Sequence, residues 1–254
     1  MQPFEVWLSL GRNNSIHTMK NTNLFLLIAI VLSFTSCRKV LFDSGNLIVE
    51  ERVISESYTG IVVEGSMDVY IVQDSTFDIQ VEAGERKMPF IKTKVFSDDL
   101  IITEEDNHII NDKRTKVYVS ASFLNRLEMS GSGNVYGTGI VGDYLNIDLQ
   151  GSGDIQIDVE VEGYVDLDVR GSGDTKLTGT ATSLSVNIEG SGDVDARYLP
   201  VDDCHVFIDG SGDVRVNVSS HLHIEINGSG DVYYWGDPES IDIDINGSGD
   251  VHHM

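Results

Sequence analysis

The sequence is poor in cysteine, proline and basic residues, and each shortage narrows the choice of fold and partner. Its 254 residues contain two cysteines, four prolines and 17 Lys plus Arg, against 41 Asp plus Glu and 25 glycines. Few prolines and many glycines suit one long β domain. The formal net charge of −24 argues against nucleic acid as a partner, because an acidic surface repels phosphate backbones.

The shortage of bases is greatest in the second half of the chain. From Gly131 onward there are 23 acidic residues and four basic ones, which are Arg170, Lys176, Arg197 and Arg215. We expect this half to present a solvated acidic surface, which repels anionic glycans and limits edge-to-edge aggregation.

Signatures of catalysis are also missing. The sequence shows no Ser/His/Asp order, nucleophile elbow, phosphate loop or cofactor fingerprint. Some proteins of the parallel β-helix class cleave acidic polysaccharides with Asp pairs or basic residues in a groove. We therefore predict a protein that is not an enzyme and keep a glycan-active β-helix enzyme as a third alternative.

The apolar run Leu24–Phe34 has eleven residues, too few to span a bilayer of ~30 Å. It follows a short basic start at Met19-Lys20 and precedes Thr35-Ser36-Cys37, an order typical of a secretory signal peptide. We predict that residues 1–18 are a non-native start extension, which N-terminal sequencing of the unprocessed precursor tests. Residues 19–37 are then the signal peptide and 38–46 a tether.

The two cysteines have different expected roles. Residues 33–37 resemble a bacterial lipoprotein box, which implies that Cys37 is lipidated; the alternative is a Cys that ends an ordinary signal. No intramolecular disulfide is then available to Cys204. Cys204 stands in the column of Leu145, Val165, Leu184, Leu222 and Ile241 relative to the repeats described next, so we predict a small core residue and no nucleophile.

What the sequence does contain is a recurring phrase, Gly-Ser-Gly-Asp. It appears as Gly-Ser-Gly-Asn at Gly131 and then as GSGD starting at Gly151, Gly171, Gly190, Gly210, Gly228 and Gly247. The steps between first glycines are 18 to 20 residues. A fixed period of this length predicts a solenoid in which each repeat is one coil.

The residues around each phrase alternate between apolar and polar. Positions two and four before the first glycine and four after it are apolar in nearly every copy, as in Leu127, Met129 and Val135. This pattern predicts two strands per repeat with one buried face and coils stacked ~4.8 Å apart. The predicted fold class is all-β, a parallel β-solenoid (β-helix) with repeats of ~20 residues marked by GSGD turns.

We expect one solenoid domain over 47–254, with irregular coils over 47–127 and regular repeats over 128–254. The first part alternates but lacks the phrase, and Gly65-Ser66-Met67-Asp68 looks like a worn copy of it. The lysine-rich piece Arg86–Lys94 and the acidic loop Glu104–Asp112 are expected to leave the column.

Four stretches together resemble the putative auto-transporter adhesin, head GIN domain family. They are residues 58–65, 68–73, 124–133 and Tyr234-Trp235-Gly236-Asp237-Pro238. The resemblance implies a secreted or lipid-anchored β-solenoid of the Bacteroidota cell envelope, and it supplies no catalytic residues. Fold analogy alone does not give function.

The resemblance leads us to expect a non-catalytic, lipid-anchored adhesin-like scaffold that binds a glycan or an envelope or host protein. We expect an outer membrane lipoprotein, at the cell surface or on the periplasmic face. The alternative is a structural envelope or assembly protein facing the periplasm.

Three groups of residues are candidate sites. The aspartates of the phrase are a candidate calcium column, because Ca²⁺ between coils would relieve their repulsion; alternatively they cap turn amides and need no ion. These residues are Asp154, Asp174, Asp193, Asp213, Asp231 and Asp250. No other cofactor is expected.

His205, His223 and Asp242 each stand five residues before a first glycine. They should form one outward column with zinc-type ligands, or be three ordinary polar surface residues. Tyr233, Tyr234 and Trp235 could stack on a neutral sugar, or cap the open end of the core.

Overall fold

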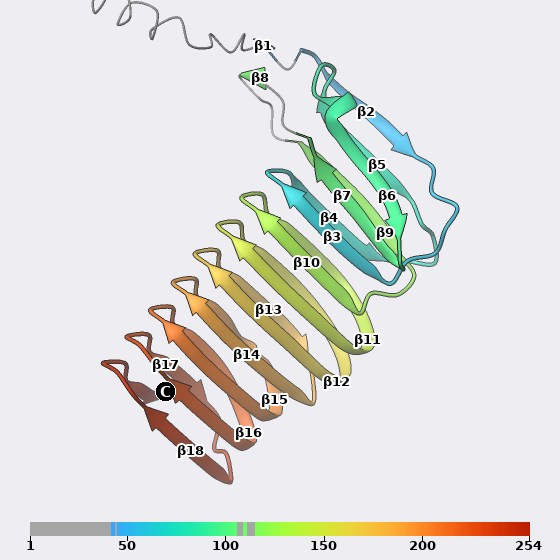
Figure 1. Ribbon diagram of the computed structural model, residues 1–254. Helices are drawn as coiled ribbons and strands as arrows, with labels where there is room; N and C mark the ends of the chain where they lie inside the picture. Colours follow the sequence, from blue (N-terminus) through green and yellow to red (C-terminus); the bar gives the residue numbers. More distant parts are fainter. Residues whose placement is uncertain (1–41, 44, 106–108, 111–114) are drawn as a thin grey trace, which may run out of the picture. The chain divides into compact units, whose positions relative to one another are not determined.

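The backbone of the computed structural model winds into stacked coils, each built from two strands that meet at a glycine corner (Figure 1). This confirms the predicted parallel β-solenoid. The structure describes residues 42–43, 45–105, 109–110 and 115–254, which belong to one compact unit. The predicted start extension, the signal peptide and Cys37 lie outside the described residues.

The strands that lead into the glycine corners form one parallel face, here called face A, which two N-terminal strands extend. In spatial order face A consists of β6 (Ile91–Phe96), β7 (Asp99–Glu104), β3 (Gly60–Gly65), β10 (Arg126–Gly131), the second parts of β11 (Val135–Gly151) and β12 (Ile155–Gly171), β14 (Ser183–Gly190), the second parts of β15 (Val194–Gly210) and β16 (Val214–Ile226), and β18 (Ser240–Ile245). The register keeps the same side chains inward on every strand.

The strands that follow the corners form the opposite face, face B. In order it consists of β2 (Leu47–Arg52), β5 (Ile79–Gly84), β9 (Lys116–Ala121), β4 (Asp68–Gln73), the first parts of β11 and β12, β13 (Thr175–Thr180), the first parts of β15 and β16, β17 (Val232–Trp235) and β19 (Val251–His253). A separate pair joins β1 (Phe42–Asp43) to β8 (Ile109–Ile110), and η1 (Met88–Phe90) precedes β6. The predicted tether, 38–46, thus contributes the strand β1.

Backbone hydrogen bonds between coils explain why the corners need glycine. The amide N–H groups of Ser172 and Gly173 both donate to the carbonyl of Gly151, one coil earlier, at 2.8 and 3.2 Å. Gly171 has φ 138°, and a Cβ placed on it would lie 2.2 Å from that same carbonyl oxygen. Only a residue without a side chain fits this close approach and this backbone conformation.

The variable step of 18 to 20 residues is absorbed at the opposite corner. Between β13 and β15, whose coils differ in length by one residue, the register shifts between Lys176 and Thr178. Between β15 and β16 it shifts in the stretch from Ala196 to Asp203. The glycine corners therefore keep strict register, while the second corners take up the difference in length as bulges.

Columns of apolar side chains fill the space between the two faces. One column runs through Leu167, Val186 and Val206, which pair in register and are buried. Cys204 lies between Leu184 and Leu222 in the neighbouring column and is 1% exposed. Burial raises the pKa of its thiol to about 12, so Cys204 is the core residue that the sequence predicted.

The first coil confirms the worn copy of the phrase, because Gly65-Ser66-Met67-Asp68 matches Gly131-Ser132-Gly133-Asn134 in register. The chain order around it is irregular. After β4 the chain builds β5, β6, β7 and β9 on one side of the first coil, partly antiparallel, before β10 continues the stack on the other side.

One expectation for this region is wrong in part. The lysine-rich piece Arg86–Lys94 does not leave the column as a whole, because Ile91–Phe96 is the outermost strand of face A. Ile91 is buried, while Lys92 and Lys94 point outward, so the lysines solvate the outer side of a strand. The acidic loop lies only partly within the described residues, where Glu104 ends β7.

Within the part of the chain that the structure describes, no further coil covers the last one. On β18 the residues Ile241, Ile243 and Ile245 are 42%, 43% and 39% exposed, although their columns are buried in the preceding coil. Among the residues that the structure describes, no helix has the length and apolar character needed to cross a membrane.

Candidate functional site

One outward residue from each strand of face B lies in a single row across the strands. Its members pair in register from β2 to β19 and all are at least partly exposed. In spatial order they are Glu51, Gln80, Tyr118, Tyr70, Tyr136, Gln156, Lys176, Asp195, Arg215, Tyr233 and His252. We call this set the outer row. Its members follow one another at the strand spacing of ~4.8 Å.

Three tyrosines form a stack within the outer row. The ring of Tyr70 lies between those of Tyr118 and Tyr136, with both centroid distances 5.1 Å and both interplanar angles 19°. The ring faces inside the stack therefore cover one another. A ligand can reach the hydroxyl edges and the two outer ring faces, those of Tyr118 toward Gln80 and of Tyr136 toward Gln156.

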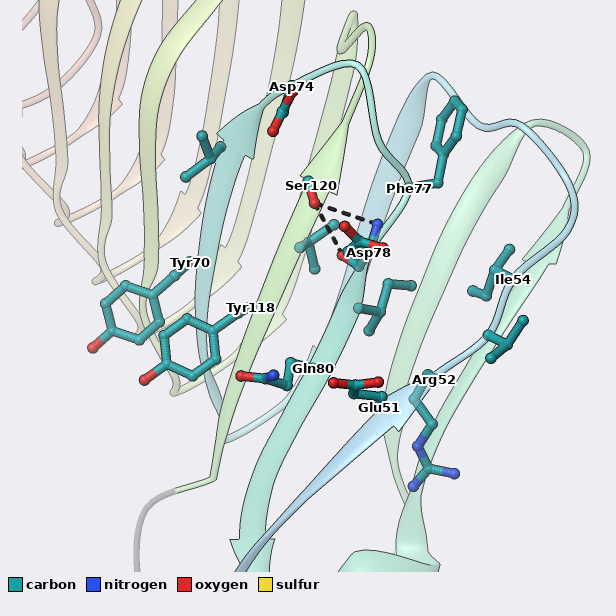
Figure 2. A pocket seen from close by; sticks show the side chains of 14 residues that line it. Glu51, Arg52, Ile54, Tyr70, Asp74, Phe77, Asp78, Gln80, Tyr118 and Ser120 are labelled. Atoms are coloured by element: carbon teal, nitrogen blue, oxygen red, sulfur yellow. Dashed lines mark hydrogen bonds between the residues drawn. The ribbon is translucent and has the colours of Figure 1, made fainter.

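The tyrosine stack borders a pocket of about 590 Å³ on face B. Figure 2 shows Tyr70, Tyr118, Gln80 and Glu51 side by side in one row, with Phe77 and Ile54 apart from that row; all six line the pocket. The lining comes from β2, β4, β5 and β9 and from the segments that follow β2 and β4. The pocket therefore exists only where the irregular N-terminal strands extend face B.

Hydrogen bonds and a ring contact hold the loop between β4 and β5, which forms one wall of the pocket. The hydroxyl of Tyr58 donates to the carbonyl of Ser120 at 2.7 Å, and its ring meets Phe77 edge-on at 5.2 Å. The Ser120 hydroxyl bonds with both the amide N–H and the carbonyl of Asp78, each at 3.3 Å. Burial, and then the charge of Asp78, raise the pKa of Tyr58 to about 12, so its phenol stays a hydrogen-bond donor.

The charged side chains of the pocket are mostly acidic. Glu51, Asp74 and Asp78 are exposed carboxylates in its lining. Arg52 is the one base among the lining residues, and it forms an ion pair with Glu50 at 3.0 Å. The Nε atom of Arg52 is buried and has no hydrogen-bond partner among the residues that the structure describes. Arg52 pairs in register with the buried Ile79, so its side chain lies on the other side of β2 from Glu51. The pocket thus combines aromatic rings, carboxylates and the amide of Gln80.

A second hollow, of about 330 Å³, continues along the outer row from Tyr136. Gln156, Lys176, Asp195 and Arg215 line it, together with aspartates of the repeat phrase. Arg197 donates to Asp195 through Nε at 2.8 Å and through a terminal nitrogen at 2.7 Å. This bond lowers the pKa of Asp195 from its usual value.

The predicted calcium column forms a ladder of hydrogen bonds. The amide N–H of Asp154 donates to Oδ1 of Asn134 at 3.2 Å, and that of each later aspartate donates to Oδ1 of the aspartate one coil earlier. The pairs are Asp174 to Asp154 (3.0 Å), Asp193 to Asp174 (2.9 Å), Asp213 to Asp193 (2.9 Å), Asp231 to Asp213 (3.0 Å) and Asp250 to Asp231 (2.9 Å). Each carboxylate therefore caps a turn amide of the next coil. Calcium binding by this column stays a prediction.

The predicted zinc trio does lie in one outward column, since His205, His223 and Asp242 pair in register. Nδ1 of His223 lies 3.1 Å from a carboxylate oxygen of Asp242, and the two imidazole centroids are 5.5 Å apart. The group of described residues whose ligand atoms all lie within 4.8 Å of one another is a different one: Asp231, Asp250 and His252. Zinc at the first trio stays a prediction.

The aromatic residues near the C-terminus lie one coil inside the end of the stack. The ring of Tyr233 stacks on His252 at 4.9 Å and that of Tyr234 on His253 at 4.7 Å. The guanidinium of Arg197 lies 5.6 Å from the Trp235 ring centroid. Tyr233 and Tyr234 therefore contact the last strand, and only Tyr233 belongs to the outer row.

The sequence interpretation missed most of the outer row. Its members in the repeats stand five residues after the first glycine, as Tyr136, Gln156 and Lys176 do, so this part could have been found by aligning the copies. Tyr118, Gln80 and Glu51 carry no such signal, because strands outside the repeat place them. Tyr233 is the one residue that both the sequence prediction and the row contain.

These features define a two-faced parallel β-solenoid with a hollowed outer face. The chain belongs to the putative auto-transporter adhesin, head GIN domain family, which it matches over residues 57–238. This confirms the resemblance seen in the sequence. Among curated proteins, none matches the chain.

Solved structures share the fold at low sequence identity. A putative adhesin from Bacteroides fragilis is 22% identical with a TM-score of 0.78, covering 82% of this chain and 97% of its own. A putative adhesin from Parabacteroides merdae is 18% identical with a TM-score of 0.64, covering 84% and 98%. A putative lipid binding protein from Parabacteroides distasonis is 22% identical with a TM-score of 0.63, covering 84% and 99%.

Proposed function

We propose that this protein is a non-catalytic, lipid-anchored envelope adhesin that binds glycan chains along the outer row, with the pocket beside Tyr118 as the main subsite. Membership of an adhesin family supports a binding role. The observation that carries the glycan assignment is the pocket of about 590 Å³ in which an aromatic stack meets amide and carboxylate groups.

The chemistry of a sugar ring matches these groups. A pyranose has an apolar face that packs on an aromatic ring and hydroxyls that bond to amides and carboxylates. Tyr118 offers an outer ring face, and Gln80 and Glu51 follow it in the row. The outer row repeats at the strand spacing, which is close to the length of one sugar unit in an extended chain, so a chain could continue toward the second hollow.

Replacing Tyr118 by alanine should weaken glycan binding at least tenfold, because it removes the ring face that borders the pocket; this corresponds to about 1.4 kcal/mol. A glycan array read with the purified protein, followed by calorimetry on the best ligand, measures the effect. Tyr164→Ala is the matched control, since Tyr164 is an exposed member of another tyrosine stack, with Tyr144. Unchanged affinity in Tyr118→Ala, or an equal loss in Tyr164→Ala, would contradict the proposed site.

The proposed location rests on the lipoprotein-like segment that ends at Cys37. Protease treatment of intact cells tests it: a surface adhesin is stripped while the outer membrane is still closed. A protein that survives until that membrane is opened would support the alternative function, a structural or assembly role in the periplasm. The exposed edge of β18 favours this alternative, since it could pair with a strand of another protein.

A further inference from the structure

Resting on the proposed function, we infer that the pocket beside Tyr118 selects sugars that carry a free, protonated amino group. The inference follows from the charges of its lining residues. Glu51, Asp74 and Asp78 contribute three exposed carboxylates, and the one base, Arg52, is already paired with Glu50 outside the lining. The lining therefore has an excess of negative charge, which a cationic group of the ligand would balance.

The aromatic side chains point to the same kind of ligand. An ammonium group is attracted to the face of a tyrosine or phenylalanine ring within ~6 Å of its centroid. Tyr118 presents its outer ring face beside the pocket, and Phe77 lines the opposite side (Figure 2). Asp68 and Lys116 are partners in register two residues before Tyr70 and Tyr118. Their opposite charges add no net charge at this end of the tyrosine stack.

Gln80 offers a contact for the neutral part of the same sugar. Its exposed side chain stands between Tyr118 and Glu51 in the outer row. A side-chain amide both donates and accepts hydrogen bonds, so the pocket can hold an ammonium group and bond to a hydroxyl of the same ring.

Other classes of sugar fit the pocket less well. A sugar acid would bring a carboxylate to three carboxylates on a protein of net charge −24, and like charges at this range repel. A neutral sugar, including an N-acetylated one, would gain the ring contact and hydrogen bonds but would leave the carboxylates without a counter-charge. The preference should therefore follow the charge of the amino group.

Calorimetric titration of the purified protein with three oligosaccharides of equal length tests this inference. The probes are a glucosamine oligomer with free amino groups, its N-acetylated counterpart and a glucose oligomer. We expect at least tenfold tighter binding of the free-amine oligomer at pH 6, and a loss of that preference when 1 M salt screens the charges.

A triple variant tests whether the pocket carboxylates are responsible. Glu51→Gln with Asp74→Asn and Asp78→Asn keeps the shape of three exposed side chains and should abolish the preference. The control, Asp166→Asn with Glu189→Gln and Asp209→Asn, removes the same charge from exposed positions on face A and should retain it. Unfolding temperatures of both variants show that the fold is intact.

The outcomes separate the inference from the proposed function. Equal binding of the N-acetylated and free-amine oligomers would overturn the amine preference and leave glycan binding standing. An equal loss in the face A control would also overturn it, because the effect would then come from the net charge. If none of the three oligomers binds, and the glycan array is also empty, the proposed function fails as well.

Discussion

Replacing Gly171 by alanine is expected to lower the free energy of unfolding by about 3 kcal/mol. Two costs act at this position. The backbone of Gly171 has φ 138°, which side chains of L-residues rarely adopt. The new Cβ would also overlap the backbone of Gly151, with its nitrogen and carbonyl carbon at 3.0 Å and its oxygen at 2.2 Å. That backbone is fixed by two hydrogen bonds from Ser172 and Gly173 and cannot move aside without breaking them.

Gly142→Ala is the matched control for Gly171→Ala. It lies in β11 at the second corner, where a Cβ would meet its nearest neighbour, the Phe123 ring, at an ordinary 3.7 Å. We expect a change of less than about 1 kcal/mol there. Equilibrium unfolding in urea measures both variants. A similar loss at the two positions would show that the close approach at the glycine corner is not what limits substitution.

Replacing Lys87 by methionine is expected to cost about 3 kcal/mol. Lys87 is 1% exposed, and its Nζ atom lies 2.9 Å from a carboxylate oxygen of Glu104, which is 14% exposed. The same carboxylate accepts a hydrogen bond from the hydroxyl of Ser66 at 3.1 Å. Removing the ammonium leaves Glu104 charged in a mostly dry environment, which is the costly way to break such a pair.

Arg86→Met provides the comparison, because Arg86 is the preceding residue, carries the same charge and is exposed. Its loss should change the free energy of unfolding by about 0.5 kcal/mol or less. Thermal and urea unfolding of the two variants under the same conditions decide the question. Equal stability of Lys87→Met and the unsubstituted protein would show that the buried ion pair contributes nothing net.

The repeated half of the fold could be predicted because each copy has the same glycine phrase with apolar residues at the same positions around it. Gly190, the apolar Ile188 before it and the apolar Val194 after it have equivalents in nearly every coil, so alternation and period together define two faces and a corner. The copies also differ little in length, and the register follows from stacking alone. The position of Cys204 in the core followed directly from its column.

The N-terminal strands could not be derived in the same way. Ile91–Phe96 and β7 form a local hairpin around Ser97 and Asp98, which both have positive φ. Nothing local shows that this hairpin joins β3 at the edge of face A, because β3 and β7 are distant in the chain. Sequence alternation identified the strand character of 77–81 and 117–119, but it gave neither their neighbours nor their order. The pocket lies among these strands, so it could not be predicted without knowing which of them are neighbours.

The candidate site shows the same limit. Tyr118 and Tyr70 stand 48 positions apart in the chain and stack at 5.1 Å only because β9 folds back beside β4. From the sequence we selected Tyr233, Tyr234 and Trp235 because they are adjacent in the chain. In a solenoid, however, one continuous surface is formed by residues that are neighbours across strands, and these are not the residues that are neighbours along the chain.

The bulges at the second corners affect how the sequence and length of such a protein can change in evolution. Because the bulges between Lys176 and Thr178 and in the stretch from Ala196 to Asp203 already absorb differences of one or two residues, insertions there leave the glycine corners and the core in place. Duplication of a whole coil extends both faces by one rung. Evolution, or an engineer who grafts loops onto this scaffold, can thus alter the length of the solenoid and its binding specificity separately. Loops at the second corners can vary, while the glycine corners keep the register of the stack.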